Sequence, residues 1–203
     1  MSIYVTSDLH FGHDKDFLYL PRKFNSIAEH DAGIIANWNS VVQPEDTVYV
    51  LGDIMLNDNE QGIECLRQLR GYIKIVLGNH DTPTRIAQYE TLPNIKVLGY
   101  ADVIKYKKYT FYLSHYPTIT SNYDLDKPLK ARVVNLCGHS HTPFPFEDID
   151  RGLIYHVVLD AHDCRPVSLD TVIEKMKLRE EAENQLLKQM ESFLGKDAKF
   201  YHA

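Results

Sequence analysis

Three features that define whole classes of protein are missing or scarce in this sequence. No apolar run approaches the roughly 18 residues that a membrane-spanning helix needs. The start, MSIYVTSDLH, has neither the basic n-region nor the apolar h-region of a secretion signal, so we expect a soluble, cytoplasmic protein. The three cysteines, Cys65, Cys137 and Cys164, show no CxxC spacing, which disfavours a disulfide framework and fits a reducing compartment.

Two recognition signals are also missing. No GxGxxG follows the first apolar run, which disfavours a nucleotide-binding sensor of the doubly wound type. Lys and Arg are scattered and the net charge is −6, so a large contact with extended nucleic acid is disfavoured. Histidine, in contrast, occurs ten times, and it is the side chain most used for metals and for proton transfer near neutral pH.

Six short apolar runs have the length and β-branching of strands. They span residues 3–7, 47–52, 73–78, 110–115, 132–138 and 153–160. Helical patterns lie between the early runs: residues 26–42 open with Ser26 and Glu29 in capping-box spacing, and residues 59–71 end at Gly71. This order predicts a parallel sheet wound by right-handed crossovers in the first half, and a more antiparallel second half.

The C-terminal segment, 168–203, predicts a long helix to about residue 194 and a tail, after a domain of residues 1–170. Its apolar residues form two patches separated by the acidic stretch REEAEN. We expect the first patch to dock on the domain. The second patch could pack back, which is the favoured interpretation, or meet another subunit in a homodimer. Gly195 is a plausible C-terminal stop.

Five of the apolar runs end in Asp, Asn or His. These residues are Asp8 with His10, Asp53, Asn79 with His80 and Asp81, His115, and His139 with His141. Any one of them could be an ordinary cap or core histidine. Ligands bind outside the carboxyl ends of strands in open α/β sheets, however, so five such coincidences predict one shared crevice.

The residue types at these strand ends indicate metal chemistry. Carboxylate, amide and imidazole ligands without cysteine suit borderline to hard divalent ions such as Mn²⁺, Fe²⁺ or Zn²⁺. A pair of ions needs a bridging ligand, and a carboxylate with two oxygens is the natural candidate. Asp53 fits that role because it stands alone at its strand end.

On these residues the sequence resembles the calcineurin-like metallophosphoesterase superfamily. The matching blocks are Asp8-Leu9-His10, Gly52-Asp53, Gly78-Asn79-His80-Asp81, His115 and Gly138-His139-Ser140-His141, in the family's order. The resemblance implies a four-layer α/β/β/α sandwich of two mixed sheets flanked by helices, with the site in the loops after the strands. Compact bacterial phosphoesterases are the most similar in size.

The resemblance also implies a role for each residue. The first ion would be held by Asp8, His10 and His141, and the second by Asn79, His115 and His139, with Asp53 bridging the pair. Mn²⁺ is the favoured metal, with Fe²⁺, Zn²⁺ or Ni²⁺ as alternatives, and a metal-bridging hydroxide would attack phosphorus. His80, held by Asp81, would lie beside the phosphoryl group as a catalytic residue.

Departures from the family pattern narrow the expected function. The GDxxDRG block of protein Ser/Thr phosphatases is absent and their GNHE is GNHD here, which disfavours a protein phosphatase. After His13, Asp14-Lys15 replaces the GHxN pattern of the nearest small relatives. We therefore expect hydrolysis of a small phosphodiester, or less favourably a phosphomonoester. The alternatives are a nuclease on short nucleic acid and a non-catalytic scaffold with the same fold, and the intact ligand set favours catalysis.

Other polar residues are weaker candidates for the pocket. The group that follows the first block and could meet substrate is His13, Asp14, Lys15, Arg22 and Lys23. A solvated loop is an equally good interpretation of that group. His156, His162 and Tyr116 could also face the site, whereas His30 and His202 are predicted to lie on the surface.

Overall fold

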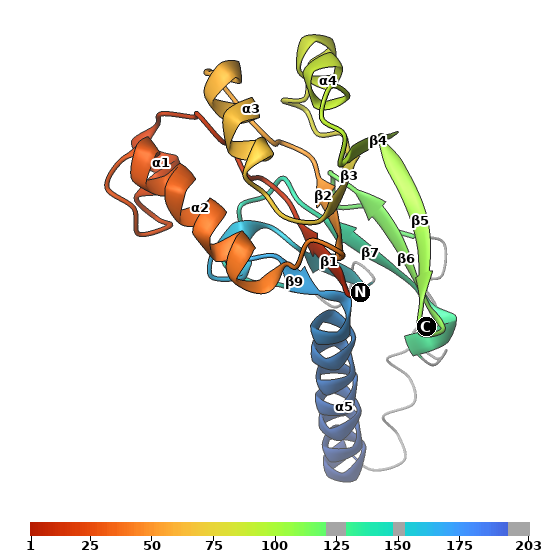
Figure 1. The fold of residues 1–203 in the computed structure, drawn as a ribbon. Helices are drawn as coiled ribbons and strands as arrows, with labels where there is room; N and C mark the ends of the chain where they lie inside the picture. Colours follow the sequence, from red (N-terminus) through yellow and green to blue (C-terminus); the bar gives the residue numbers. More distant parts are fainter. Residues whose placement is uncertain (121–128, 148–152, 195–203) are drawn as a thin grey trace. The chain divides into compact units, whose positions relative to one another are not determined.

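The computed structural model describes residues 1–120, 129–147 and 153–194. The chain forms two compact units, Met1–Leu169 and Asp170–Ala203. Two β-sheets and the helices beside them make up the first unit (Figure 1). The predicted arrangement of two mixed sheets flanked by helices is confirmed.

The first sheet contains five strands in the spatial order β4-β3-β2-β1-β9. They are β1 (Ile3–Thr6), β2 (Thr47–Leu51), β3 (Tyr72–Val76), β4 (Ile95–Gly99) and β9 (Val167–Ser168). The first four are parallel, as the alternation of strands and helices predicts, and the short edge strand β9 is antiparallel. Strands β4 and β9 were not expected from the sequence.

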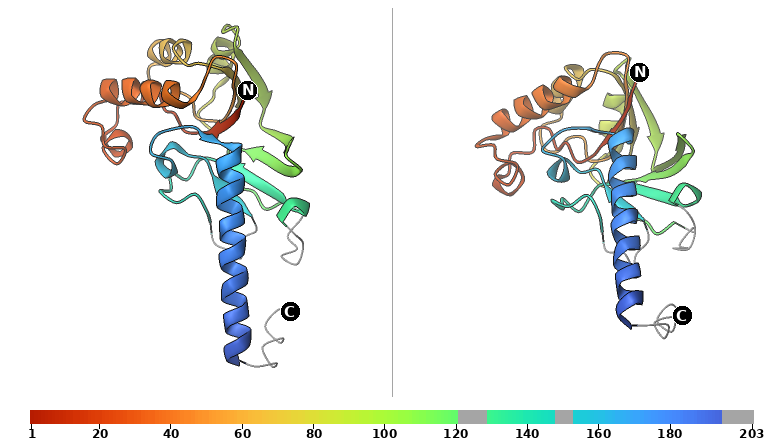
Figure 2. Two further views of the ribbon diagram at one scale, coloured as in Figure 1. Left: turned by 60° about the horizontal axis from the view of Figure 1, so that its bottom comes forward. Right: turned by 90° about the horizontal axis from the view of Figure 1, so that it is seen from below.

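Helices cover one face of this sheet (Figures 1 and 2). The helices between its strands are α1 (Asp16–Tyr19), α2 (Ile27–Val41), α3 (Asn59–Arg67) and α4 (Pro83–Tyr89). Ser26 caps α2, because its hydroxyl accepts a hydrogen bond from the backbone N–H of Glu29 at 3.2 Å. Ile34 and Trp38 of α2 pack in one core with Val50 of β2 and with apolar residues of α3 and β3.

The opposite face of the first sheet is buried as well. Val5, Leu51 and Val76 alternate with the residues that face the helices, and each is fully buried. Burial on both faces explains why these strands are continuous apolar runs in the sequence. It also leaves the strand ends as the places where polar side chains can reach solvent.

The second sheet has the order β5-β6-β7-β8. Its strands are β5 (Ala101–Tyr106), β6 (Tyr109–Ser114), β7 (Val133–Cys137) and β8 (Ile154–His156). The expected antiparallel pairing is present in the β5–β6 hairpin, whereas β6 with β7 and β7 with β8 pair in parallel. Parallel pairing needs crossovers of a dozen or more residues, and the long segments before β7 and β8 provide them. The run predicted over 153–160 is a strand only in β8, and a short 3₁₀ helix, η3 (Leu159–Ala161), follows.

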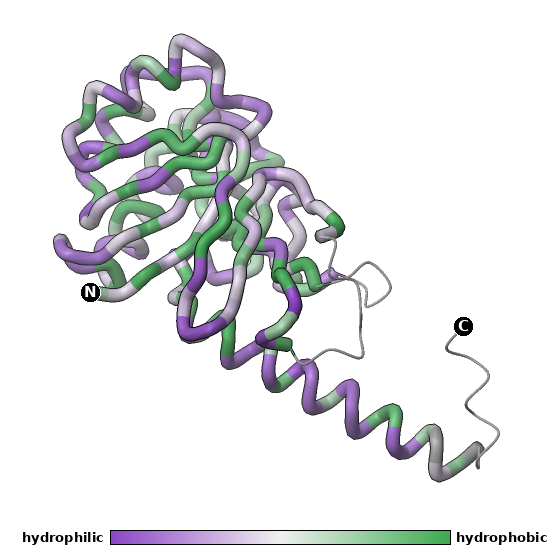
Figure 3. The backbone as a smooth tube through the Cα atoms, turned by 90° about the vertical axis from the view of Figure 1, so that its right-hand side faces the viewer, coloured by the Kyte–Doolittle hydropathy of each residue, from purple (hydrophilic) through white to green (hydrophobic). Residues whose placement is uncertain are grey.

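The described part of the second unit belongs to the helix α5 (Leu169–Leu194), which has the length expected from the sequence. Hydrophilic and hydrophobic residues alternate along it (Figure 3). Leu186, Leu187 and Met190 of its second apolar patch are exposed to solvent, and their role in a homodimer stays a prediction. Gly195 and His202 lie outside the described residues. In the described parts of the chain, no helix is both long and apolar enough to cross a membrane.

Candidate metal centre

Loops that follow strands of both sheets meet at one place. The backbone N–H of Asp8 donates to the carbonyl of Gly52 at 3.0 Å, which joins the loops after β1 and β2. The backbone N–H of Gly138 donates to the carbonyl of His115 at 2.9 Å, which joins the loops after β7 and β6. Ser7 and Val158 form a bridge between the ends of β1 and β8. The predicted convergence of strand ends therefore occurs.

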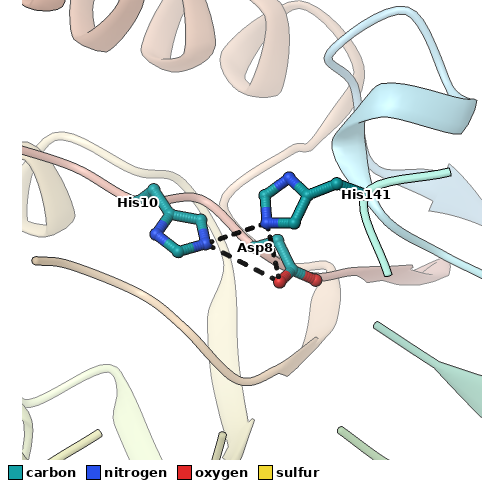
Figure 4. Close-up of side chains that lie close together, drawn as sticks. All are labelled: Asp8, His10 and His141. Atoms are coloured by element: carbon teal, nitrogen blue, oxygen red, sulfur yellow. Dashed lines mark hydrogen bonds and ion pairs between the residues drawn. The ribbon is translucent and has the colours of Figure 1, made fainter. Parts of the chain in front are cut away.

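The first ligand group consists of Asp8, His10 and His141 (Figure 4). One ligand atom from each residue lies within 4.8 Å of the others. The Nε2 atoms of His10 and His141 are 3.2 Å apart, and they lie 3.7 and 3.5 Å from Oδ1 of Asp8. These three side chains, from two distant parts of the sequence, therefore aim their donor atoms at one point.

The second ligand group consists of Asn79, His115 and His139. Oδ1 of Asn79 accepts hydrogen bonds from Nε2 of His115 at 2.9 Å and from Nδ1 of His139 at 3.1 Å. Nδ1 of His115 donates to the carbonyl of Leu51 at 2.8 Å, which fixes the orientation of its ring. Nε2 is thereby left as the atom of His115 that faces the site.

Asp53 lies between the two groups. Its Oδ2 is 3.9 Å from Nε2 of His10 and 3.4 Å from Nε2 of His115. Its Oδ1 accepts the backbone N–H of His80 at 2.9 Å. Asp8, Asp53 and His115 also bring donor atoms within 4.8 Å of one another. This is the position that a ligand shared by both groups must occupy.

Five of the seven predicted ligands have a left-handed backbone. The φ angles are +59° at Asp8, +52° at His10, +56° at Asp53, +73° at His139 and +47° at His141. This region is uncommon for residues other than glycine, and such strain persists where the surrounding structure enforces it. Among the described residues, five of the eleven non-glycine positions with positive φ are therefore predicted ligands.

Two glycines make room for the carboxylates of the site. A Cβ at Gly78 would collide with Oδ1 of Asp53, and a Cβ at Gly138 would collide with Oδ2 of Asp8. The glycines of GNHD and GHSH are therefore needed for close approach of the backbone to Asp53 and Asp8.

The electrostatics favour ionised carboxylates. Burial would raise the pKa of Asp8, but the nearby imidazoles of His10 and His141 outweigh burial and lower the pKa to about 2. The pKa of Asp53 is lowered, against the effect of burial, by His115. Burial would lower the pKa of His115, yet Asp53 and Asp8 raise it to about 9. Burial lowers the pKa of His10.

The residues present fit divalent metal ions. Oδ1 of Asp8 and Nδ1 of His10 are buried without a hydrogen-bond partner among the described residues, and Oδ1 of Asp8 is one of the atoms that converge. A buried ionised carboxylate needs compensating charge. The donor set of carboxylate, amide and imidazole is one that divalent ions such as Mn²⁺ and Zn²⁺ accept.

His80 and Asp81 are neighbours in the sequence but differ in surroundings. The His80 side chain is 39% exposed, and its Nε2 lies 3.9 Å from Oδ2 of Asp53. The Asp81 carboxylate is buried and accepts hydrogen bonds from the backbone of Asp53, Ile54 and Gly78 and from the hydroxyl of Tyr89. The expectation that Asp81 holds the His80 ring is therefore corrected, because these four donors occupy its oxygens.

A cavity of about 550 Å³ opens over the site. Both ligand groups and His80 contribute to its lining, and apolar residues add a wall. The wall consists of Phe17, Leu18 and Pro21 from the chain after β1 and Leu56 from the chain after β2. His13 also lines the cavity, and burial, together with the charges of His10 and His80, lowers its pKa to about 4. Tyr116 lies beside the second group, with its ring centroid 4.6 Å from that of His139.

The other candidates from the sequence lie elsewhere. Asp14 and Lys23 line different cavities, and Lys15 is the exposed N-cap residue that precedes α1. His156 is fully buried, and its Nδ1 lies 3.1 Å from the hydroxyl of Ser140 behind the ligand loop. His162 bonds to the carbonyl of His156.

Asp160 was missed by the sequence reasoning although it contacts the site. Its Oδ2 lies 3.2 Å from Nδ1 of His141. The signal was available, since Asp160 ends the sixth apolar run, 153–160, just as polar residues end the other five. His30, predicted on the surface, is in fact fully buried and contacts Arg22.

The chain belongs to the calcineurin-like phosphoesterase superfamily. Residues 1–158 match the domain described as "calcineurin-like phosphoesterase superfamily domain". Membership supports the assignment of the chain as a metal-dependent phosphoesterase, which is a class of hydrolase. It agrees with the resemblance that the motifs show.

Relatives and a solved structure are similar over most of the chain. An uncharacterized protein of Methanocaldococcus jannaschii is 33% identical over 180 residues, which cover 85% of this chain and 89% of the relative. The Gene 66 protein of Mycobacterium phage L5 is 29% identical over 194 residues, which cover 84% of this chain and 92% of the phage protein. A protein of unknown function from Aquifex aeolicus shares the fold, with a TM-score of 0.59 and 24% identity over 86% of this chain and 98% of that one.

Proposed function

We propose that this protein is a dinuclear-metal phosphoesterase that hydrolyses a small phosphate ester, with a phosphodiester favoured over a phosphomonoester. The observation that carries the proposal is the position of Asp53 between two ligand groups that each present three side chains. A single-metal site would need only one of these groups. Two groups that share a carboxylate support a pair of ions.

The first ligand group would hold one ion and the second group the other, with Mn²⁺ as the proposed metal. When bound, the ions supply positive charge that lowers the pKa of water and neutralises phosphoryl oxygens. The chain's own contribution is positional: Asp8 and Asp53 keep their carboxylates ionised, and Leu51 fixes the ring of His115.

His80 is the proposed proton donor and phosphoryl contact. Its ring lines the cavity, is partly exposed, and lies beside Asp53. An imidazole is suited to donate a proton to a leaving oxygen near neutral pH. Asp81 takes part indirectly, because its hydrogen bonds to the backbone of Asp53 and Gly78 hold the two loops that carry Asp53 and His80.

The walls of the site support a diester. An exposed ring stands near each ligand group: Phe17 contacts His13, whose ring lies beside that of His10, and Tyr116 contacts His139. A phosphodiester has an organic group on each side of phosphorus, so each group could contact one ring. A cavity of about 550 Å³ fits a small substrate.

The setting proposed for this activity is the cytoplasm. The three cysteines are unpaired and buried, which fits a reducing compartment. The partner is the small substrate itself.

The experiment is hydrolysis of bis(p-nitrophenyl) phosphate and of p-nitrophenyl phosphate by chelator-stripped protein, before and after addition of Mn²⁺. Manganese-dependent turnover with preference for the diester is expected. Preference for the monoester would overturn the diester assignment. Absence of turnover in folded, metal-loaded protein would overturn the enzymatic proposal and favour a scaffold. Asp53→Asn protein, purified in the same way, controls for contaminating phosphatases.

A further inference from the structure

A buried ion pair stands behind the first ligand group. Asp160, in η3, accepts two hydrogen bonds from the guanidinium of Arg22: Nη2 to Oδ2 at 2.7 Å and Nε to Oδ1 at 3.1 Å. The Arg22 side chain is 1% exposed and that of Asp160 is 14% exposed. These residues are 138 positions apart in the sequence. Such a two-bonded pair fixes both side chains in direction as well as in distance.

Asp160 determines which nitrogen of His141 faces the ligand group. Oδ2 of Asp160 lies 3.2 Å from Nδ1 of His141, and a carboxylate oxygen can only accept, so Nδ1 carries a proton. In the neutral ring, Nε2 then keeps its lone pair. Nε2 is the nitrogen that faces Oδ1 of Asp8 and Nε2 of His10. A metal ligand needs this tautomer.

Arg22 reaches the same ligand group by a second route. Its Nη2 donates to the backbone carbonyl of Asp8 at 2.9 Å, at a residue whose backbone is left-handed. Nη2 also lies 3.4 Å from Nδ1 of His141, but both are donors, and Oδ2 of Asp160 accepts from both. One guanidinium thus supports two of the three ligands.

His30 and Asp31 of α2 complete the support behind Arg22. Nη1 of Arg22 lies 3.1 Å from Nε2 of His30, which must accept, so Nδ1 of His30 carries the proton and donates to Oδ1 of Asp31 at 3.0 Å. Oδ2 of Asp31 accepts the backbone N–H of Gly12 at 3.1 Å. The chain of contacts therefore returns to the loop that carries His10.

We propose that Asp160, held by Arg22, is a positioning residue for the first ligand group: it keeps the His141 ring oriented with Nε2 ready to bind a divalent ion. The inference rests on the proposed function insofar as it takes that group as a metal site. The second ligand group has none of these contacts among the described residues, so the effect is selective. Loss of an outer partner of this kind weakens metal affinity by about 10- to 100-fold.

The test measures the two dissociation constants for Mn²⁺ of the chelator-stripped full chain by competition with a metal-binding dye. Asp160→Asn should weaken one constant by about 10- to 100-fold and leave the other unchanged. Asp46→Asn is the matched control, because Asp46 is also buried and accepts hydrogen bonds from the backbone of Ser2 and Gln43, away from the site. It should leave both constants unchanged.

A double-mutant comparison identifies the residue through which Asp160 acts. In a His141→Ala background, Asp160→Asn should cause no further loss of affinity. An additional loss there, equal weakening of both constants, or unchanged constants in Asp160→Asn would overturn the inference. If Asp160→Asn does not fold, Arg22→Lys gives the same test, since lysine keeps the charge but cannot form the two-bonded pair. Selective weakening is then expected again, and unchanged constants would overturn the inference.

Metal binding is measured without turnover, so the two proposals can fail separately. Wild-type protein that binds two ions but hydrolyses neither ester contradicts only the proposed activity. Active wild-type protein whose constants match those of Asp160→Asn contradicts only the positioning role of Asp160.

Discussion

The first and second ligand groups depend on different kinds of partner. Behind the first group, the buried charges of Arg22 and Asp160 orient His141 and the backbone of Asp8. In the second group, apart from the shared Asp53, the contacts that orient the rings are neutral groups: the carbonyl of Leu51 holds His115, and the amide oxygen of Asn79 accepts from both histidines. These contacts lie at the strand ends themselves.

This difference decides how far away a substitution can act. A backbone carbonyl at a strand end stays in place as long as the sheet does, so the second group should respond mainly to changes in its own residues. A buried ion pair leaves an uncompensated charge when one partner is lost. The first group should therefore be sensitive to residues distant in the sequence.

The largest effect is expected for Asp53, the residue that both ligand groups share. Asp53→Asn should lose metal from both groups and lose activity, because a neutral amide bridges two cations poorly. The loss should exceed the roughly 100-fold associated with outer partners. Metal content and esterase rates of the purified variant check this. Full metal content with full activity would remove the bridging role of Asp53.

His80→Ala should separate catalysis from metal binding. His80 contacts Asp53 but belongs to neither group, so both Mn²⁺ constants should stay unchanged while kcat falls by about 10²- to 10⁴-fold. Steady-state kinetics and dye competition on the same preparation measure both quantities. Loss of a bound ion in this variant would contradict the role assigned to His80.

Asp81→Ala should act on stability. It removes the acceptor of three backbone N–H groups and of the Tyr89 hydroxyl. These hydrogen bonds connect the loop after β2, the loop after β3 and the helix α4. We expect the free energy of unfolding to fall by about 3 kcal/mol. Urea denaturation of the metal-free protein measures this. His80→Ala is the matched control and should unfold like the wild type.

Two glycine variants should affect different parts of the site. Gly138→Ala would press on Oδ2 of Asp8 in the first group, whereas Gly78→Ala would press on Asp53 and on Nδ1 of His115 in the second. Gly138→Ala should weaken the Mn²⁺ constant of the first group by about tenfold, whereas Gly78→Ala, which displaces the shared Asp53, should weaken both constants. Dye competition on both variants measures the constants. A Gly78→Ala protein in which only one constant is weakened would contradict the shared position of Asp53.

The smallest effect is expected on the pH dependence of stability, through His30 behind the first ligand group. Burial lowers the pKa of His30 below its ordinary value of 6.5. The unfolded state therefore binds more protons as the pH falls below about 6.5, and stability decreases with a slope of at most about 1.4 kcal/mol per pH unit. Urea denaturation of the metal-free protein between pH 7 and 5 should show a shallower slope in His30→Gln. Identical slopes would contradict a buried neutral His30.

Much of the fold and most of the site follow from local patterns. The strands β1, β2 and β3 are continuous apolar runs because both faces of the sheet are buried, and Ser26 caps α2 as its spacing with Glu29 predicts. The strand β4 and the parallel pairing of β6 with β7 were not foreseen. Both depend on partners distant in the chain, which a local pattern does not specify.

The sequence by itself indicated the members of the two ligand groups and Asp53: each follows an apolar run, and a buried strand can place polar side chains only at its end. Tertiary structure alone decided their neighbours. Asp81 faces backbone rather than His80, and Arg22 meets Asp160 and His30 inside the protein. The physical reason is that a buried charge selects its partner by packing and desolvation across the whole fold, and these act between residues of any separation in the chain.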